Sequence, residues 1–212
     1  MKYSVCLLAA GQGVRTKLPY NKVLYKMDGK SILDYSLDLF LSDPDCAEII
    51  LTCSLQDRDA MQSYKKNSRI ELVLGGNTRQ ESVYNALQEV KYPVVFIHDA
   101  ARPYLKREQV EELKKTMETE DACVLMVPSI DTVKIVENGY VVSTLDRNIL
   151  YNAQTPQCFK TDLIRQCHDA ANKEQKIATD DTQLVEWYSK ARVKVVIGDP
   201  ANIKVTVPSD LK

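Results

Sequence analysis

Residues 3–22 read YSVCLLAAGQGVRTKLPYNK, and this stretch decides the fold class. Its first six residues, 3–8, are mostly apolar, as in a buried β-strand. A loop of small residues follows from Ala9 to Gly13, and two cations, Arg15 and Lys22, come soon after it. Glycines let a backbone approach a ligand closely, and the N–H groups of such a loop can hold phosphate oxygens. The stretch therefore predicts a strand followed by a phosphate-binding loop.

Two familiar phosphate-binding loops do not fit this chain. The dinucleotide fingerprint needs a third glycine at position 16, where the chain has Thr16. A P-loop ending at Gly29-Lys30-Ser31 would need its first glycine at position 24, which is Leu24. A Gly-x-Gly turn after a strand can also be a plain connection to the next helix. On local evidence, both the phosphate loop and the plain connection stay open.

The composition is that of a globular protein without an obvious polyanionic partner. The 212 residues carry a formal net charge of -1, so the chain lacks the net positive charge typical of proteins that bind nucleic acid or anionic membranes. No apolar run is long enough to span a membrane, and no signal peptide precedes the first strand. The six cysteines form no C-x-x-C pair, and the two histidines argue against a zinc site. We expect a cytoplasmic protein that binds neither nucleic acid nor membrane.

Strand-like and helix-like segments alternate along most of the chain. Strands are expected at 3–8, 48–54, 70–74, 94–98, 122–127, 193–197 and 203–207. Helices are expected at 31–42, 79–90, 108–117, 161–172 and 181–190, with Thr78 and Glu81 forming a capping box for the second. Continuously apolar strands that alternate with helices predict a single α/β domain over residues 1–212. It would have a Rossmann-like, mostly parallel sheet with helices on both faces.

A hairpin interrupts this alternation at about 130–150. The segments 132–136 and 140–145 flank Glu137-Asn138-Gly139, and Asn-Gly is a strong signal for a tight hairpin turn. An inserted hairpin can be a lid, an extra sheet edge or a dimerisation arm. The residue pattern does not choose among these three.

Polar and charged side chains follow several of the expected strands. Ligands of a parallel α/β sheet bind at the carboxyl ends of its strands. Asp99, directly after 94–98, could hold magnesium on a triphosphate or pair with Arg102 in a structural ion pair. Six cations lie beside such loops, namely Arg15, Lys22, Arg79, Arg102, Arg147 and Lys204. A cationic rim of this kind suits phosphoryl or nucleotidyl transfer, where catalysis is mostly positioning and charge stabilisation.

The order of the motifs resembles one enzyme family over nearly the whole chain, from about residue 3 to 211. The motifs are AAGQGVR, NK, GGNTRQESV, HDAARP, DTVK, DRNILYNAQTPQCF, TDD and NIKVT. Their order and approximate spacing are similar to those of the 2-C-methyl-D-erythritol 4-phosphate cytidylyltransferases. The resemblance implies a homodimeric nucleotidyltransferase of the non-mevalonate isoprenoid pathway. Such an enzyme transfers CMP from CTP to a sugar-alcohol phosphate, releases pyrophosphate and uses Mg²⁺.

The resemblance also implies roles for individual residues. Those expected in catalysis are Arg15, Lys22 and Lys204, the first two at the α-phosphate. Those expected to bind the nucleotide are Ala9, Ala10, Gly11 and Gly13 at the triphosphate and Gly76, Asn77, Arg79 and Ser82 at or near the cytosine. Those expected to hold the sugar phosphate are Asp99, Arg102, Thr132, Arg147, Thr155 and Thr179, some of them across a dimer. Asp99 would also face the metal, and the hairpin would be the interlocking arm of the homodimer.

Two other functions remain as alternatives. Ribitol 5-phosphate cytidylyltransferases tend to have Ala-Gly-Gly in the first loop and His-Asp-Ser-Val-Arg-Pro after the fourth strand. This chain has Ala9-Ala10-Gly11 and His98-Asp99-Ala100-Ala101 at these places, which favours methylerythritol phosphate. The second alternative is a non-catalytic nucleotide-binding protein on the same fold. The joint presence of four functional residues argues against it, namely Arg15, Lys22, Asp99 and Lys204.

Two positions depart from the family pattern. The family often has Pro-Lys-Gln where this chain has Asn21-Lys22-Val23, so Lys22 is expected to approach the nucleotide from a different local backbone. The family often has Asp on the cytosine side, where this chain has Asn77. The approach of Lys22 and the base contacts at Asn77 are therefore the two expectations that the family pattern supports less.

Overall fold

The computed structural model describes residues 1–11 and 18–211, and within these a seven-stranded sheet forms the centre. The strand order is β11-β7-β10-β6-β1-β4-β5. The strands are β1 (Tyr3–Leu8), β4 (Cys46–Cys53), β5 (Ile70–Leu74), β6 (Val94–Asp99), β7 (Ala122–Pro128), β10 (Tyr151–Lys160) and β11 (Val193–Ile197). All neighbours pair in parallel except β10, which is antiparallel to both β6 and β7. The expected mostly parallel sheet is confirmed.

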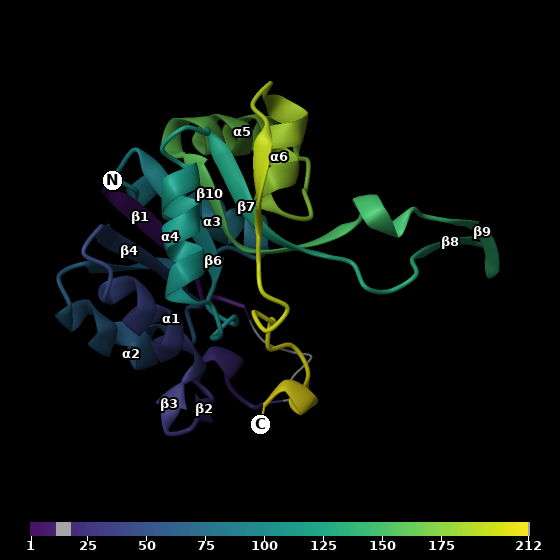
Figure 1. The fold of residues 1–212 in the computed structure, drawn as a ribbon. Helices are drawn as coiled ribbons and strands as arrows, with labels where there is room; N and C mark the ends of the chain where they lie inside the picture. The colour runs from purple at the N-terminus through teal and green to yellow at the C-terminus, as the bar shows by residue number, and fades with distance from the viewer. Residues whose placement is uncertain (12–17, 212) are drawn as a thin grey trace.

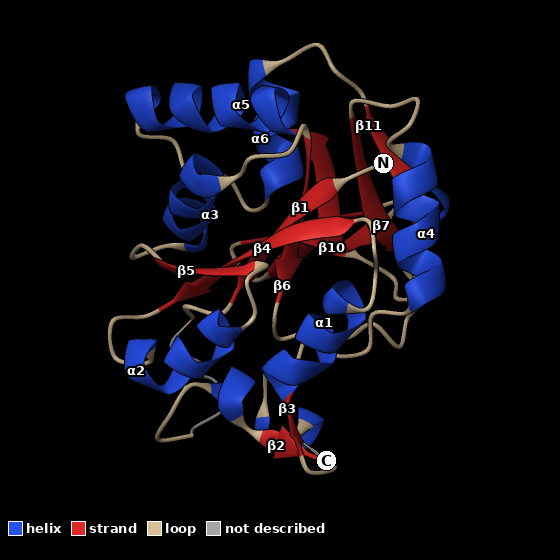
Figure 2. Ribbon diagram, turned by 90° about the vertical axis from the view of Figure 1, so that its left-hand side faces the viewer, coloured by secondary structure: helices blue, strands red, loops and turns tan. Residues whose placement is uncertain are grey.

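Helices cover both faces of this sheet (Figure 2). One face carries α1 (Ile32–Leu41) and α4 (Arg107–Thr116), and the other carries α3 (Arg79–Glu89), α5 (Thr161–Glu174) and α6 (Asp181–Tyr188). Side chains of a strand alternate between faces, so Val5 and Leu7 of β1 pack in the first layer and Cys6 packs in the second. No helix within residues 1–11 and 18–211 has both the length and the apolar character needed to cross a membrane.

Local sequence explains where the helices begin. Ser31 caps α1, accepting from the backbone N–H of Asp34, whose carboxylate accepts from the N–H of Ser31 in return. Thr78 caps α3 in the same way by accepting from the N–H of Glu81. The expected capping box is wrong in its second half. The Glu81 carboxylate accepts from the N–H of Asn77 at 2.8 Å and not from the N–H of Thr78. Glu81 therefore orders the loop before the helix.

Two segments in the second half of the chain differ from expectation. Residues 203–207 are not a strand; they form a loop in which the N–H of Val205 donates to Ala101 O at 2.8 Å. Strand β10 was not expected, because its sequence YNAQTPQCFK is polar and contains Pro156. The ladder between β10 and β7 is interrupted from Ala153 to Gln157, which accommodates a proline that has no N–H to donate. Pairing on both sides overrides the weak local preference of this segment.

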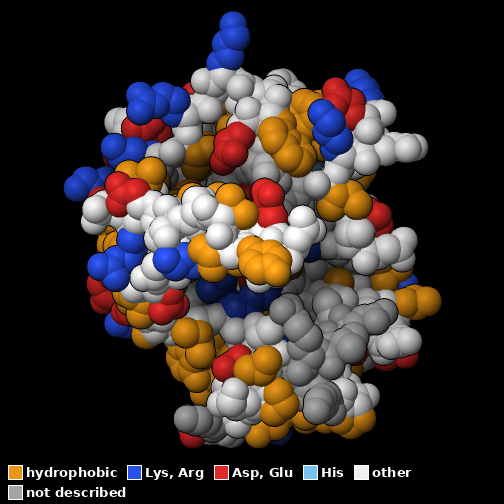
Figure 3. Space-filling view, turned by 90° about the vertical axis from the view of Figure 1, so that its right-hand side faces the viewer, with side chains coloured by type: hydrophobic (Ala, Val, Ile, Leu, Met, Phe, Trp, Pro, Cys, Tyr) orange, Lys and Arg blue, Asp and Glu red, His pale blue; other side chains and the backbone are white. Residues whose placement is uncertain are grey.

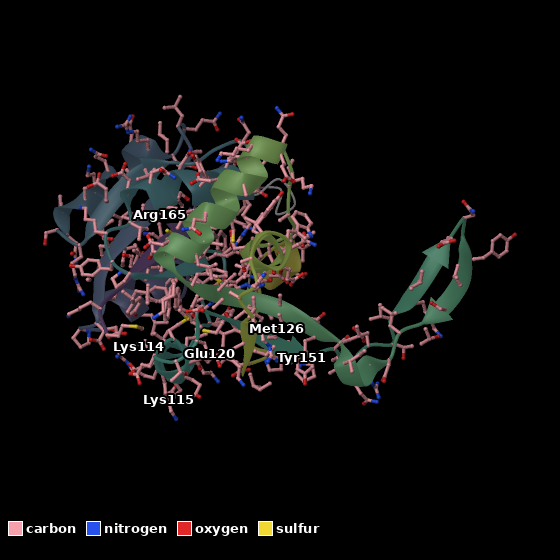
Figure 4. All side chains as sticks on the ribbon, turned by 90° about the horizontal axis from the view of Figure 1, so that it is seen from above. Lys114, Lys115, Glu120, Met126, Tyr151 and Arg165 are labelled. Atoms are coloured by element: carbon pink, nitrogen blue, oxygen red, sulfur yellow. The ribbon has the colours of Figure 1, made fainter. Side chains whose placement is uncertain are left out.

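The expected hairpin is confirmed as an arm that projects away from the body (Figure 1). The arm spans about residues 130–150 and contains β8 (Lys134–Glu137), β9 (Tyr140–Thr144) and the short 3-10 helix η4 (Arg147–Ile149). Asn138 and Gly139 have φ values of 50° and 84°, the two positive values of a tight hairpin turn. Seen from above, Met126 of β7 and Tyr151 of β10 lie where these strands leave the body (Figure 4). The arm thus continues two adjacent strands of the sheet, β7 and β10.

All six cysteines are buried and unpaired. Burial raises the pKa of the Cys46 thiol to about 12, so this side chain is protonated and unreactive at neutral pH. Cys6, Cys53, Cys123 and Cys158 pack in strands, where they act as small apolar residues. The thiols are part of the core.

Candidate active site

A cleft of about 790 Å³ opens at the carboxyl ends of β1, β4, β5 and β6. Its volume lies in the range of small-molecule sites. Ten of the residues singled out by the sequence line it, namely Ala9, Ala10, Gly11, Lys22, Gly76, Asn77, Arg79, Ser82, Asp99 and Lys204. Viewed along the arm, Lys and Arg side chains gather in a recess of the molecular surface (Figure 3). The cleft therefore joins small-residue loops and cations, as nucleotide binding requires.

The loop between β5 and α3 approaches the first loop closely. A Cβ on Gly75 would collide with the Cβ of Ala10 and would lie 2.8 Å from Ser82 Oγ, so only glycine fits there. Ser82 Oγ accepts from the N–H of Gly76 at 3.1 Å and donates to Thr78 O at 2.9 Å. Ser82 thus holds the Gly75–Gly76 turn, and the backbone of that turn forms the cleft wall.

Lys22 lies at the start of a short 3-10 helix, η2 (Lys22–Leu24), which Asn21 holds in place. The Asn21 side chain accepts from the N–H of Val23 at 3.2 Å and donates to Ala9 O at 2.7 Å. It also donates to Asp57 Oδ2 at 2.9 Å. A proline, which the family resemblance would lead one to expect here, has no side-chain donor for these contacts. Asn21 therefore fastens the turn that carries Lys22 to the first loop.

Asp99 is the anionic centre of the cleft. Arg79 Nε donates to its Oδ1 at 3.1 Å and Lys204 Nζ donates to its Oδ2 at 2.7 Å. The backbone N–H of Asp99 donates to Thr155 Oγ1 at 3.1 Å. Burial by itself would raise the pKa of this carboxyl, but the Arg79 and Lys204 cations hold that pKa well below its usual range. Asp99 is therefore ionised at neutral pH.

The remaining expected site residues lie outside the lining of this cleft. Arg102 donates to Asn202 O at 2.7 Å, and Thr155 is buried beneath Asp99. Three others are exposed, namely Thr132 and Arg147 on the arm and Thr179 before α6. Gly13 and Arg15 lie outside the described residues. One chain therefore assembles the nucleotide side of the expected site more fully than the sugar-phosphate side.

Comparison with known proteins decides the family. A family model described as 2-C-methyl-D-erythritol 4-phosphate cytidylyltransferase matches residues 3–212. The chain belongs to this family. The cytidylyltransferase of Halalkalibacterium halodurans is 38% identical over 216 residues, which cover 100% of this chain and 94% of that protein. The one from Bacillus velezensis is also 38% identical, covering 100% of this chain and 93% of that protein.

Solved structures of this cytidylyltransferase family share the fold. The crystal structure of 4-diphosphocytidyl-2C-methyl-D-erythritol synthase from Anaerococcus prevotii has a TM-score of 0.88 and 30% identity, covering 99% of this chain and 94% of that one. The 2-C-methyl-D-erythritol 4-phosphate cytidylyltransferase of Francisella tularensis has a TM-score of 0.85, also at 30% identity, covering 100% of this chain and 97% of that one. The family predicted from the ordered motifs is confirmed.

Two residues that contact the lining of the cleft were not assigned a role from the sequence. Asn21 was noticed only as a departure from the family pattern, yet it organises the turn of Lys22. Asp181 belongs to the quoted TDD motif, and its Oδ2 accepts from Arg79 Nη1 at 2.7 Å. An acidic residue in the first turn of an expected helix was the available signal, but its partner is 102 residues away along the chain.

His98 gives the folded protein a specific sensitivity to acid. It is fully buried, and burial lowers its pKa to about 4. The pKa of histidine in the unfolded chain is about 6.5, so below that pH the unfolded chain binds a proton that the folded protein does not. The folded state therefore has its full stability above pH 6.5 and loses stability as the pH falls toward 4. We expect the free energy of unfolding to decrease by about 3 kcal/mol between pH 7 and pH 4.

Urea unfolding at pH 7, 5.5 and 4.5 measures this effect. A His98→Asn variant keeps a side-chain nitrogen for the contact that His98 Nδ1 makes with Thr155 Oγ1 at 3.0 Å. It should show a flatter pH dependence over the same range. An equal slope in both proteins would contradict the assignment to His98, because carboxyl groups with lowered pKa, such as Asp99, lose their contribution only at lower pH.

Proposed function

We propose that this chain transfers CMP from CTP to 2-C-methyl-D-erythritol 4-phosphate and releases pyrophosphate. The observation that carries the proposal is the shared cleft of the first loop, Lys22 and the Asp99–Lys204 pair, within a chain of this family. Backbone N–H groups of the loop suit the triphosphate, and the turn at Gly75–Gly76 suits the base.

The proposed reaction is an in-line displacement at phosphorus. An oxygen of the sugar phosphate forms a bond to the α-phosphorus of CTP, and the bond from that phosphorus to the bridging oxygen breaks, so that pyrophosphate leaves. A phosphate monoester is largely ionised near neutral pH, so no general base is needed. Lys22 and Lys204, placed at the cleft, would stabilise the negative charge that develops on the phosphate oxygens. This fits a site whose nearby His98 is buried and neutral at pH 7.

We propose Mg²⁺ as the cofactor, held by Asp99 together with the phosphates of CTP. Proteins commonly bind Mg²⁺ through one or two carboxylates plus substrate phosphates, so a single buried carboxylate fits this use. Both oxygens of Asp99 contact cations, and the metal would replace one of these contacts. When bound, Mg²⁺ supplies neutralisation of the phosphate charge.

Pyrophosphate release tests the proposed activity directly. Purified protein with CTP and Mg²⁺ is given either 2-C-methyl-D-erythritol 4-phosphate or ribitol 5-phosphate. Turnover with the first substrate alone is expected. Turnover with ribitol 5-phosphate would show that the proposed acceptor is wrong. Binding of CTP without pyrophosphate release in either reaction would support the non-catalytic alternative.

We further propose that the arm joins two copies of this chain and completes the sugar-phosphate side of the site. The arm exposes apolar side chains that a monomer would leave in water, among them Ile130, Tyr140 and Ile149. It also carries Thr132 and Arg147, which lie away from the cleft of their own chain. A partner's arm could supply them. We propose a cytoplasmic location as well, since six unpaired cysteines suit a reducing compartment.

A charge on the arm should separate the copies. Val142 is more than half exposed, and a Val142→Asp variant would carry a carboxylate into the proposed interface. We expect light scattering to give the mass of one 24.0 kDa chain for the variant and twice that for the wild type. Arg147→Ala serves as the matched variant, because it should lower turnover without changing the mass. A wild-type protein of single-chain mass would contradict the proposal.

A further inference from the structure

A line of alternating charges runs from the cleft into the core. Lys204 contacts Asp99 at 2.7 Å, and Asp99 contacts Arg79 at 3.1 Å. Arg79 contacts Asp181 at 2.7 Å, and Asp181 lies 3.2 Å from His168 Nε2. The cleft end of this line holds residues of the proposed reaction, whereas Asp181 and His168 have no place in that reaction.

Asp181 is enclosed and held in a fixed position. Asp181 is only 1% exposed, and it does not line the cleft. Its backbone N–H donates to Gln157 Oε1 at 3.0 Å, and Gln157 Nε2 donates to Asp180 Oδ2 at 2.8 Å. Gln157 belongs to β10, the neighbour of β6, so the start of α6 is tied to the strand beside the one that carries Asp99. The first turn of a helix also favours a negative charge.

The two carboxylates that contact Arg79 differ in what can reach them. Asp99 lines the cleft and would exchange its contacts when metal, nucleotide or sugar phosphate enters. Asp181 does not line the cleft, so ligands entering the cleft would leave its 2.7 Å contact with Arg79 in place. An arginine without a fixed partner would follow the phosphate charges or Asp99, and its place on the cleft wall would be lost.

We propose that Asp181, supported by His168, is a positioning residue that holds Arg79 on the nucleotide side of the cleft. This inference rests on the proposed function. Asp181 acts through Arg79 and touches no substrate. It leaves Asp99 able to change partners during the reaction while the wall beside the base stays in place.

A double-mutant cycle on CTP affinity tests this role. Loss of a hydrogen bond between charged groups costs about 1.5–3 kcal/mol, so Asp181→Asn should weaken CTP binding about 10- to 150-fold by calorimetry. The kcat at saturating CTP should change only a few-fold. In an Arg79→Ala background, Asp181→Asn should add no further loss, because its effect passes through Arg79. Equal losses in both backgrounds would indicate a merely structural role and overturn the proposal.

Controls separate the other outcomes. Asp162→Asn removes a carboxylate from the first turn of α5, where the side chain is exposed, and should leave CTP affinity unchanged. Should Asp181→Asn fail to fold, Arg79→Lys keeps the positive charge but cannot contact both carboxylates, and should weaken CTP binding similarly. CTP affinity equal to wild type in either variant overturns the proposal. Wild-type protein that binds CTP without pyrophosphate release overturns the proposed activity, while the cycle still decides the role of Asp181.

Discussion

Replacing Lys22 with alanine should lower kcat about 100- to 1000-fold, as does loss of a donor that acts mainly in the transition state. Lys22 lines the cleft beside the first loop, on the turn that Asn21 fastens to Ala9. Its charge would stabilise oxygens of the α-phosphate as the bond to pyrophosphate breaks. Single-turnover measurements at saturating CTP isolate this step, and CTP affinity should change far less than kcat.

The nearby Lys26 provides the control for Lys22. It is exposed and does not line the cleft, so Lys26→Ala should turn over like the wild type. A near-normal kcat for Lys22→Ala would remove this residue from the chemistry. A large rise in the Kd for CTP at unchanged kcat would instead assign Lys22 to binding.

Replacing Asp99 with asparagine should damage both stability and turnover. The carboxylate is buried between Arg79 and Lys204, and its loss leaves these cations poorly compensated. Breaking a buried pair costs about 3–5 kcal/mol, and we expect about 3 kcal/mol because Arg79 keeps Asp181. Turnover should fall at least about 100-fold, by analogy with loss of other transition-state contacts. Urea unfolding and pyrophosphate release measure the two effects.

Added CTP distinguishes this explanation from simple damage to the fold. The triphosphate brings negative charge to the same cations, so saturating CTP should raise the free energy of unfolding of Asp99→Asn by more than it raises that of the wild type. The exposed Lys65–Glu71 pair, 2.9 Å apart, gives a matched control. Glu71→Gln should cost less than about 1 kcal/mol, since surface ion pairs contribute little. Equal stability of Asp99→Asn and the wild type would contradict the charge balance described here.

Much of the fold was predictable because its signals are local. Apolar runs identified β1, β4, β5, β6 and β7, and Ser31, Thr78 and Asn138-Gly139 marked helix starts and the hairpin turn. Strand β10 was not predicted because its sequence is polar, and it forms a strand by pairing with β6 and β7 on either side. Residues 203–207 were expected to form a strand and do not, because their apolar Val205 packs in a small cluster with Met27 and Ile32.

The sequence by itself determined the family and most of the residues at the nucleotide side of the cleft. The ordered motifs carry that information, because each one is a short run whose chemistry is visible in its own letters. Only the tertiary structure decided that Asp99 contacts Arg79 and Lys204, and that Arg79 also contacts the buried Asp181. These partners are 20 to 105 residues apart along the chain. Their charges meet because the sheet brings distant strand ends together, and no local pattern encodes such a meeting.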